Sequence, residues 1–315
     1  MGRRYAYLFP GQGSQYVGMG HDLYENYPAA RNAFAQADDV LGIRLSRMCF
    51  EGPSGVLDDT VNTQPAILAT SVAALRVLEV LGLEPPDYVA GHSMGEFSSL
   101  VAAGVLSFEE GLRLVRERGA LMKDAGLRRP GGMAAILGLE RPSVEDVCVE
   151  ACEETGAYVG VANDNCPGQI VLSGAKPALR YAMEIAPTRG AKRAIPLAVS
   201  IAAHSPLMED AAVAFAERLA ATPLEEPTVP IVMNALAQPV RAPELIRDAL
   251  AQQLTSPVRW TESMSWMVAQ GVDVCVEIGP KDVLTNLLRR IDRSTERMTT
   301  SDAVARYGAA AAPSG

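Results

Sequence analysis

The segment at residues 91–95, with the sequence GHSMG, places the tightest restriction on how this chain can fold. A short apolar run, Tyr88–Ala90, precedes it, and an apolar helical stretch over 94–104 follows it. A strand that turns this sharply into a helix needs small residues two positions to either side of the central residue, and both positions hold glycine. The pattern therefore predicts a buried strand, a strained turn at Ser93 and a helix, which together form a unit of α/β proteins.

The rest of the chain also alternates short apolar runs with helical segments, which predicts an α/β fold. We expect a first strand at Tyr5–Phe9, a buried helix near 66–81 and a late strand at 272–277. Between the last two, residues from about 128 to 199 follow the order strand, helix, strand, strand, helix, strand. That order is typical of a ferredoxin-like unit, so this segment is predicted to be a small subdomain inserted into a larger one.

The predicted boundaries follow changes in composition. The large subdomain is expected to comprise 1–127 and 200–291, and the small subdomain 128–199, which begins in a segment rich in arginine, proline and glycine. From Asp292 onward the sequence becomes polar and ends in a run of alanines followed by Pro-Ser-Gly. We therefore expect 292–315 to form a loosely ordered tail.

Composition excludes several classes of protein. The 315 residues carry 28 Lys and Arg against 37 Asp and Glu, a net charge of -9 that is unfavourable for general nucleic-acid binding. No apolar stretch is long enough to span a membrane, and the run before Pro10 is too short for a signal peptide. Cys148 and Cys152 have a spacing that two metal ligands could use, but the apolar stripe around them favours buried thiols. Free thiols fit a reducing cytoplasm, where we expect this protein to work.

Ser93 is the candidate nucleophile, because the turn lifts its hydroxyl out of the sheet at the start of a helix, where free amides favour negative charge. It needs a base, and the chain has only three histidines: His21, His92 and His204. His92 is adjacent to Ser93 in a turn that makes the two side chains diverge, and His21 lies in a polar segment typical of an exposed helix start. Elimination favours His204, which follows a predicted strand, over its interpretation as an ordinary structural histidine.

A glycine loop, residues 11–15 with the sequence GQGSQ, follows the first predicted strand. A dinucleotide-binding fingerprint would need a third glycine where Tyr16 stands, and a Walker loop would need Gly-Lys-Ser/Thr. Two interpretations stay open: a plain tight turn, or a loop that presents a backbone N–H to a developing oxyanion.

Arg118 lies in the middle of an apolar helical stripe that is formed by Leu114, Val115, Leu121 and Met122. A charge in that position is unfavourable unless it is paired. The side chain either extends along the surface to reach water, or faces inward as a guanidinium fork that binds a substrate carboxylate through two hydrogen bonds.

Eight motifs occur along the chain in the order found in one enzyme family. They are FPGQGSQ at 9–15, TQPA at 63–66, GHSMGE at 91–96, RGALM at 118–122, NDNCPGQ at 163–169 with a nearby Ser-Gly, HSPLM at 204–208, SPVRW at 256–260 and EIGP at 277–280. Through them the chain resembles the malonyl-CoA:acyl-carrier-protein transacylases of bacterial fatty-acid synthesis, to which the polyketide-synthase acyltransferases are close relatives. The resemblance covers residues from about 5 to 291.

The resemblance implies an α/β-hydrolase-like large subdomain with an inserted ferredoxin-like small subdomain, in agreement with the order of predicted strands. By position it implies that Ser93 is the nucleophile and His204 its base, in a dyad rather than a triad. It implies that the backbone amides of Gln12 and Met94 form an oxyanion hole, and that Arg118 binds the free carboxylate of malonyl.

Four further positions carry over from the resemblance. Gln253 matches the residue whose backbone carbonyl orients the histidine, and Gln64 and Asn165 match positions that line the cleft. Malonyl-selective polyketide relatives commonly have Phe before the histidine, whereas this chain has Ala203. A small residue there leaves more room beside the α-carbon of the acyl group.

Together these residues predict ping-pong transfer of malonyl from malonyl-CoA, through an acyl-serine, to the phosphopantetheine thiol of acyl carrier protein. The expected partners are malonyl-CoA, CoA and the carrier protein, with no bound cofactor or metal, no nucleic acid and no membrane, and the enzyme is expected to be a monomer. An acidic carrier protein would need basic docking residues, for which we predict Arg189, Lys192, Arg193, Lys281, Arg289 and Arg290. Three different functions stay open beside this one: a trans-acting polyketide acyltransferase for malonyl or a larger extender unit, an acyl-thioester hydrolase, and a non-catalytic carrier-binding scaffold.

Overall fold

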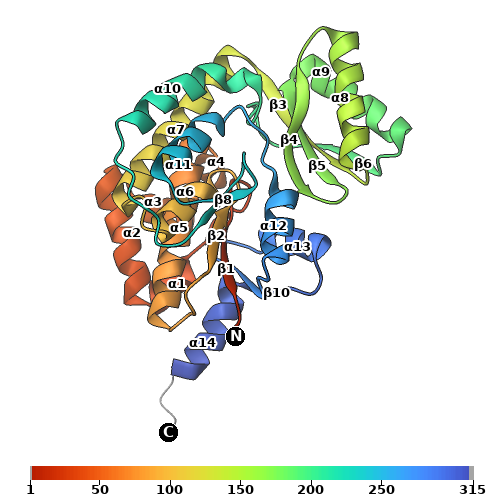
Figure 1. Ribbon diagram of the computed structural model, residues 1–315. Helices are drawn as coiled ribbons and strands as arrows, with labels where there is room; N and C mark the ends of the chain where they lie inside the picture. The colour runs from red at the N-terminus through yellow and green to blue at the C-terminus, as the bar shows by residue number, and fades with distance from the viewer. Residues whose placement is uncertain (1, 312–315) are drawn as a thin grey trace.

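The computed structural model describes residues 2–311, which form a large unit on a six-stranded sheet and a small unit on a four-stranded sheet (Figure 1). The large sheet has the strand order β10-β9-β1-β2-β7-β8, and all neighbouring pairs are parallel except β7 with β8. Its strands are β1 (Tyr5–Phe9), β2 (Tyr88–Gly91), β7 (Ile231–Met233), β8 (Gln238–Val240), β9 (Val274–Glu277) and β10 (Glu296–Thr299).

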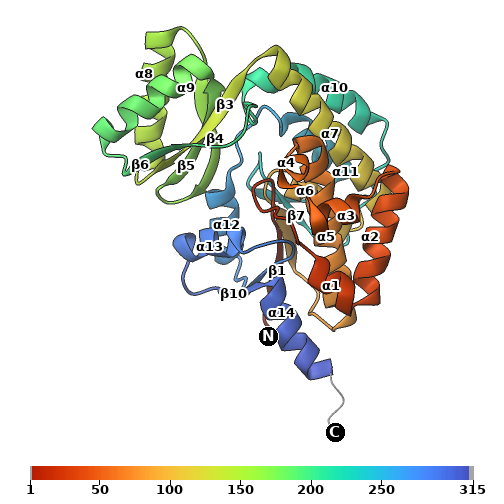
Figure 2. The same cartoon turned by 180° about the vertical axis from the view of Figure 1, so that it is seen from behind.

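The central strand β1 shows why the sheet lies between two helical layers. Tyr5, Tyr7 and Phe9 belong to one apolar cluster and Ala6 and Leu8 to another, because successive side chains of a strand point to opposite faces. In Figures 1 and 2, α12 and α13 lie on one side of β1, and α5 with α2 lies on the other. Among residues 2–311, no helix combines the length and the apolar character that crossing a membrane requires.

The helices of the large unit are α1 (His21–Asn26), α2 (Pro28–Leu41), α3 (Leu45–Glu51), α4 (Ser54–Leu57), α5 (Thr60–Val80), α6 (Gly95–Ala102), α7 (Phe108–Arg128), α10 (Glu209–Ala220), α11 (Pro243–Gln252), α12 (Trp260–Ala269), α13 (Val283–Ile291) and α14 (Thr300–Ala311), with a short 3-10 turn at Pro206–Met208.

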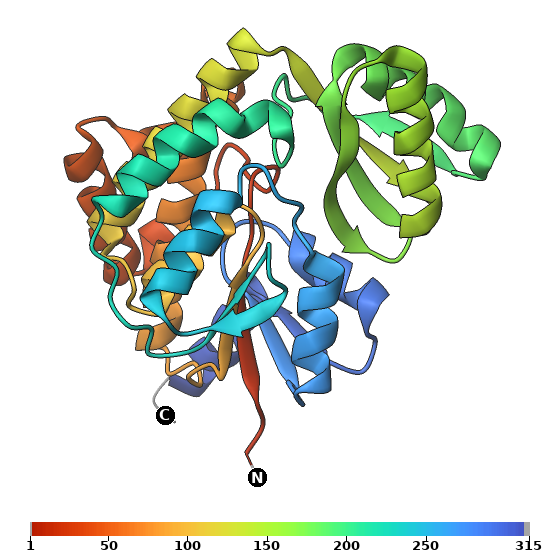
Figure 3. The same cartoon turned by 45° about the horizontal axis from the view of Figure 1, so that its top comes forward.

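The small unit has the predicted order of strand, helix, two strands, helix and strand. Its antiparallel sheet has the strand order β4-β5-β3-β6, and α8 and α9 pack together over a separate apolar core (Figure 3). Its elements are β3 (Gly131–Leu137), α8 (Arg141–Thr155), β4 (Val159–Cys166), β5 (Gln169–Ala175), α9 (Lys176–Ile185), a 3-10 turn at Ala186–Arg189, and β6 (Arg193–Pro196). The exact subdomain limits given above stay a prediction.

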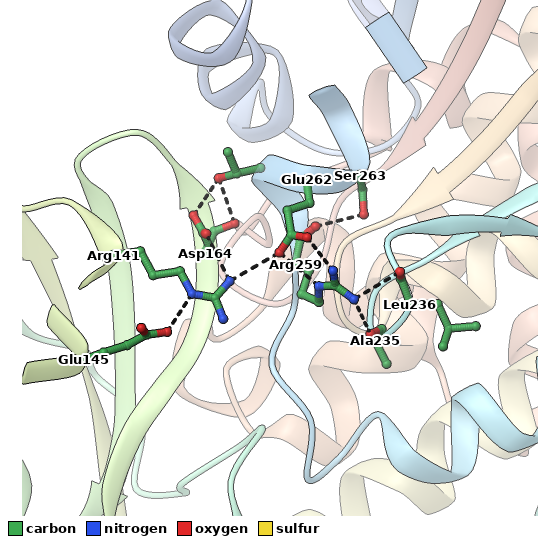
Figure 4. Close-up of polar contacts among 9 residues, drawn as sticks. Arg141, Glu145, Asp164, Ala235, Leu236, Arg259, Glu262 and Ser263 are labelled. Atoms are coloured by element: carbon green, nitrogen blue, oxygen red, sulfur yellow. Dashed lines mark hydrogen bonds and ion pairs between the residues drawn. The ribbon is translucent and has the colours of Figure 1, made fainter. Parts of the chain in front are cut away.

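A charged network ties the small unit to the large one (Figure 4). Nη1 of Arg141, at the start of α8, lies 3.5 Å from Asp164 Oδ2 on β4 and 3.3 Å from Glu262 Oε1 on α12. Arg259 donates to the same Glu262 oxygen from Nε at 2.9 Å. Beside this network, the N–H of Asp164 donates to the carbonyl of Val258 at 2.9 Å. Backbone pairing and ion pairs therefore hold the two units at a defined separation.

The C-terminal segment is more ordered than the sequence indicates. Residues 296–311, inside the predicted loose tail 292–315, form β10 and α14. The strand pairs in parallel with β9, with Glu296 opposite Val274, and α14 packs against α5. The prediction is wrong for these residues because a short polar edge strand has no hydrophobic pattern to reveal it. Residues 312–315 lie outside the described part of the chain.

Candidate active site

The predicted strand–turn–helix unit is present, since β2 ends at Gly91 and α6 begins at Gly95. Ser93 has a φ of 52°, in the left-handed region that costs a residue with a side chain roughly 1–2 kcal/mol. A Cβ at Gly91 would lie 1.9 Å from the carbonyl carbon of Gly95, and a Cβ at Gly95 would lie 2.2 Å from the carbonyl oxygen of Phe9. Close backbone approach therefore requires both glycines and holds Ser93 in its strained conformation.

His204 faces Ser93, with Nε2 2.8 Å from the serine Oγ. Its Nδ1 lies 2.8 Å from the carbonyl oxygen of Gln253 and 3.2 Å from that of Ser256. Carbonyl oxygens only accept hydrogen bonds, so Nδ1 carries the proton and Nε2 accepts from the serine hydroxyl. Burial, reinforced by the charge of Arg118, lowers the pKa of His204 to about 3. A neutral imidazole in this tautomer can take the serine proton.

The glycine loop that follows β1 lies against the turn. Gly11 has no room for a side chain, because a Cβ there would be 2.4 Å from the carbonyl oxygen of His92. Within residues 2–311, neither the N–H of Gln12 nor that of Met94 donates to another backbone group, and both residues line the same cavity as Ser93. Two free donors beside a nucleophile can hold the oxygen of a tetrahedral intermediate, which favours the oxyanion interpretation of the loop.

Arg118 is 1% exposed and faces inward from α7, which excludes the surface interpretation. Nη1 donates to Oε1 of Gln64 at 2.8 Å, and Nη2 donates to Oε1 of Gln253 at 2.8 Å. Nη2 also lies 3.4 Å from Ser93 Oγ, and Nε has no hydrogen-bond partner among residues 2–311. Burial lowers the pKa of Arg118 to about 10, although the charge of Glu96 acts to raise it. The guanidinium is therefore charged at neutral pH. A cation with an unused donor beside the nucleophile can bind a carboxylate on an acyl group.

These groups meet in a cavity of about 390 Å³ that is lined by both units. The small unit contributes Met133 and Asn163 to the lining. Of the residues predicted from the sequence, the cavity lining includes Ser93, His204, Gln12, Met94, Arg118 and Ala203.

Gln64, Gln253 and Asn165 lie outside the lining of this cavity. Gln64 is fully buried behind Arg118, and Asn165 Oδ1 lies 2.8 Å from Nε2 of His92. The expectation that Gln64 and Asn165 line the cleft stays a prediction. The pairing of β4 shifts register twice near its end, which breaks the two-residue alternation of the strand, and Asn163 lines the cavity.

Two polar residues that the sequence interpretation left without a role support the turn. Oδ1 of Asn234 accepts from the N–H of Ser93 at 2.7 Å, and its Nδ2 donates to the carbonyl of Gly91 at 2.7 Å. Glu96, 1% exposed, accepts from the backbone N–H of Asn234 at 2.5 Å. Glu96 closes the GHSMGE motif and could have been noticed there, whereas no motif marks Asn234, which follows β7.

The remaining histidine, His21, is not part of the lining of the cavity that contains Ser93. His21 begins α1 and its Nε2 lies 3.5 Å from exposed Glu25. Within residues 2–311, no group of three or more His, Cys, Asp and Glu side chains is placed to hold a metal ion.

Comparison with known proteins agrees with this geometry. The family model described as the acyl transferase domain matches residues 6–309. The malonyl CoA-acyl carrier protein transacylases of Bacillus subtilis and Escherichia coli are each 45% identical to this chain, over 297 and 288 residues. The alignments cover 94% and 91% of this chain and 93% of each relative. The chain belongs to the malonyl CoA-acyl carrier protein transacylase family.

Solved structures of malonyl CoA-acyl carrier protein transacylases share the fold of this member. That of Coxiella burnetii is 38% identical, with a TM-score of 0.94 over 97% of both chains. A malonyl-transacylase solved in complex with a type II PKS acyl-carrier protein is 41% identical, with a TM-score of 0.94 over 97% of this chain and 99% of its own. The predicted α/β architecture with two unequal parts is thereby confirmed.

Proposed function

We propose that this transacylase moves a malonyl group from malonyl-CoA to the phosphopantetheine thiol of an acyl carrier protein, through an ester on Ser93, for fatty-acid biosynthesis. The observation that carries the proposal is a buried cation, Arg118, whose Nη2 is 3.4 Å from Ser93 Oγ. In malonyl, one carbon separates the thioester carbonyl from the carboxylate, so the nucleophile and the cation that recognise them must be close neighbours. Relatives named for this transfer support the assignment.

In the first half-reaction, His204 accepts the Ser93 proton on Nε2 as Oγ attacks the thioester carbonyl carbon. The amides of Gln12 and Met94 bind the oxyanion, each contributing about 3 kcal/mol to the transition state by comparison with other acyl-transfer enzymes. The carbon–sulfur bond then breaks, and the departing sulfur takes the proton from His204. Free CoA leaves, and malonyl-Ser93 remains.

The second half-reaction runs the same steps in reverse with a new thiol. The phosphopantetheine thiol gives its proton to His204 Nε2, and its sulfur attacks the ester carbonyl carbon. The ester bond breaks, and Ser93 Oγ regains the proton. The carbonyl of Gln253 keeps the imidazole oriented through both steps, since it accepts from Nδ1 at 2.8 Å.

Arg118 links substrate recognition to the strength of the base. Its charge is one cause of the lowered pKa of His204. A malonyl carboxylate bound to Arg118 neutralises part of that charge, so the pKa of His204 rises toward its ordinary value when malonyl is in place. An acyl group without a carboxylate leaves the base weaker, so Arg118 favours malonyl in the chemical step as well as in binding.

The carrier protein is proposed to dock on the basic edge near α13 and β6. A surface hollow of about 490 Å³ lies at this edge, and its lining includes Pro167, Arg289, Arg290, Arg293 and Arg297. Arg290 donates to the carbonyl of Pro167 at 2.7 Å, which joins α13 to the β4–β5 hairpin of the small unit. Arg189, another predicted docking residue, is paired with Glu150. Arg289 and Arg290 place two positive charges on α13, beside this hollow.

Acyl-enzyme formation tests the proposal. After incubation with malonyl-CoA, intact-mass measurement should show one malonyl group on the wild-type protein and on His21→Ala, and none on Ser93→Ala. Adding carrier protein with its phosphopantetheine should move the label to the carrier. A persistent adduct on Ser93→Ala, or an unmodified wild type, would refute the proposal.

Ala203 favours a second candidate function. It lines the cavity together with Leu197 and Ile201, and it precedes the base. The space that a small side chain leaves beside the acyl α-carbon would suit a substituted malonyl group, as a trans-acting polyketide acyltransferase would need. Offering malonyl-, methylmalonyl- and acetyl-CoA together and weighing the acyl-enzyme distinguishes the two, since a dominant methylmalonyl adduct would favour the polyketide role.

A hydrolase and a non-catalytic scaffold have less support. A hydrolase that clears stalled thioesters gains nothing from a buried cation that holds a carboxylate, and a scaffold has no need of the Ser93–His204 contact. The five cysteines form no disulfide among the described residues, in keeping with a proposed role in a reducing cytoplasm.

A further inference from the structure

A buried carboxylate lies behind the nucleophile, outside the steps derived above. Glu96, the second residue of α6, is 1% exposed. Its Oε1 accepts from the backbone N–H of Asn234, and its Oε2 accepts from Nε2 of Gln253. Burial raises the pKa of Glu96 to about 7, against the two donors and the charge of Arg118, which favour the ionised form. A carboxylate in such a position is costly and therefore indicates a specific role.

Gln253 connects this carboxylate to Arg118, Ser93 and His204. Its side-chain Oε1 accepts from Arg118 Nη2 at 2.8 Å, while its Nε2 donates to Glu96 and, at 3.0 Å, to the carbonyl of Ser93. Its own backbone carbonyl accepts from Nδ1 of His204 at 2.8 Å. A rotation of the Gln253 side-chain amide would therefore remove the acceptor of Arg118 Nη2 beside the cavity.

The neighbours of Gln253 determine which way its amide points. A guanidinium has only donors, and both carboxyl oxygens of Glu96 accept hydrogen bonds in this structure. Oxygen must therefore face Arg118 and nitrogen must face Glu96. Gln64 holds the other end of the guanidinium with its own Oε1, at 2.8 Å from Nη1. With both Nη atoms held, Arg118 keeps one orientation beside the cavity.

We propose that Glu96 is a positioning residue for the recognition of malonyl: it locks the Gln253 amide so that its oxygen aims the Arg118 guanidinium at the acyl group. Glu96 does not touch the substrate. The inference rests on the proposed function, because it assigns Arg118 to the malonyl carboxylate. It predicts that changes at Glu96 alter the preference for malonyl over acyl groups without a carboxylate.

The substitution Glu96→Gln removes one acceptor with little change of shape. If the new amide accepts from Asn234 through its oxygen, its NH2 group faces Nε2 of Gln253, and two donors then oppose each other. Gln253 turns its amide to present oxygen to position 96 and NH2 to Arg118. The guanidinium loses its acceptor and moves from its place beside Ser93.

The experiment compares initial rates of Ser93 loading from malonyl-CoA and from acetyl-CoA. Glu96→Gln should lower the ratio of the two kcat/KM values about tenfold or more, the effect of losing one hydrogen bond to a charged group. Adding Gln253→Glu to it should restore much of the ratio, because the new carboxylate accepts from Arg118 and from the amide at position 96. Gln253→Glu alone should lower the ratio, since two carboxylates then face each other.

Glu277→Gln is the matched control. Glu277 is also fully buried with a raised pKa, but it accepts from the backbone N–H groups of Leu284 and Thr285, at 2.9 and 2.8 Å, at the start of α13. Its loss should lower the midpoint of thermal unfolding and leave the malonyl-to-acetyl ratio unchanged. This control shows whether the malonyl-to-acetyl ratio responds to the loss of any buried carboxylate or only to the loss of the one at position 96.

Two outcomes would overturn the positioning role of Glu96. An unchanged ratio in Glu96→Gln, even with slower loading from both substrates, would overturn the positioning role. So would a double variant with a ratio no higher than that of either single variant. If Glu96→Gln does not fold, the comparison of Gln253→Glu with the double variant carries the test. A wild-type protein that takes no malonyl on Ser93 would instead show that the proposed function has failed.

Discussion

Ser93 Oγ lies 2.8 Å from His204 Nε2, and both residues have a left-handed backbone conformation, with φ values of 52° and 59°. Neither residue is glycine, so each conformation is unfavourable by itself and persists only because the surrounding packing imposes it. The two strained positions bring Oγ and Nε2 together without any movement of the backbone. The strain therefore contributes to the preorganisation of the pair at the expense of stability.

Replacing the nucleophile should expose this strain. Ser93→Gly is expected to be more stable than Ser93→Ala by roughly 0.5–1 kcal/mol, because relief of the left-handed conformation exceeds the entropy that glycine adds to the unfolded chain. Urea unfolding of the two inactive variants measures the difference. At Ser99, inside α6, the order should reverse because alanine suits a helix better than glycine does. Equal stabilities of the two Ser93 variants would contradict the strain argument.

Arg118→Ala should lose malonyl transfer and keep or gain activity on acetyl-CoA. The loss in kcat/KM for malonyl-CoA is expected to be about 100-fold, the effect of removing charge-assisted hydrogen bonds to the carboxylate. Arg116→Ala is the control, since Arg116 lies on the same helix and donates instead to the carbonyl of Leu41. Unchanged malonyl kinetics in Arg118→Ala would remove Arg118 from the mechanism.

The pH dependence of serine modification should reflect the lowered pKa of His204. Burial, Arg118 and His92 together hold that pKa near 3, below its ordinary 6.5, so the imidazole stays neutral and able to accept a proton as the pH falls. A serine-directed reagent that carries no carboxylate should inactivate the enzyme at a constant rate from about pH 8 to about pH 5. A rate that halves near pH 6.5 would show an ordinary histidine.

Malonyl loading should depend on pH in a different way. Because a bound carboxylate offsets the charge of Arg118, the pKa of His204 is expected to be higher with malonyl in place. As the pH is lowered, the rate of malonyl loading should therefore begin to fall at a higher pH than the rate of inactivation by the reagent without a carboxylate. Coincident profiles would argue against coupling between Arg118 and His204.

Charge reversal on the basic edge should affect only the second half-reaction. Arg193→Glu and Arg289→Glu change exposed residues of the small and large units. Together they are expected to raise the KM for the carrier protein roughly tenfold at low salt, and to leave malonyl-CoA loading unchanged. Arg44→Glu, an exposed position before α3, is the matched control. Equal effects on both half-reactions would contradict a docking role.

Several parts of the site could be predicted because they depend on local rules. The glycines at 91 and 95 follow from the sharpness of the turn, and the order of elements in the small unit follows from short apolar runs. The contact of His204 with Ser93 agrees with the elimination of the other two histidines. The direction of Arg118 could not be derived in this way, since an apolar stripe on a helix is compatible with either a buried or a surface-reaching arginine.

The sequence by itself determined the strand–turn–helix unit, the serine that it presents and the short set of candidate bases, because steric limits on a tight turn act between neighbours. Only the tertiary structure decided that Gln64 holds Arg118 from behind, that Asn163 on a bulged strand lines the cavity, and that Glu96 contacts Gln253. Residues 96 and 253 are far apart in the chain, and their contact joins the first turn of α6 to the residue that follows α11. Such contacts leave no local pattern, since they depend on how whole helices and strands are placed.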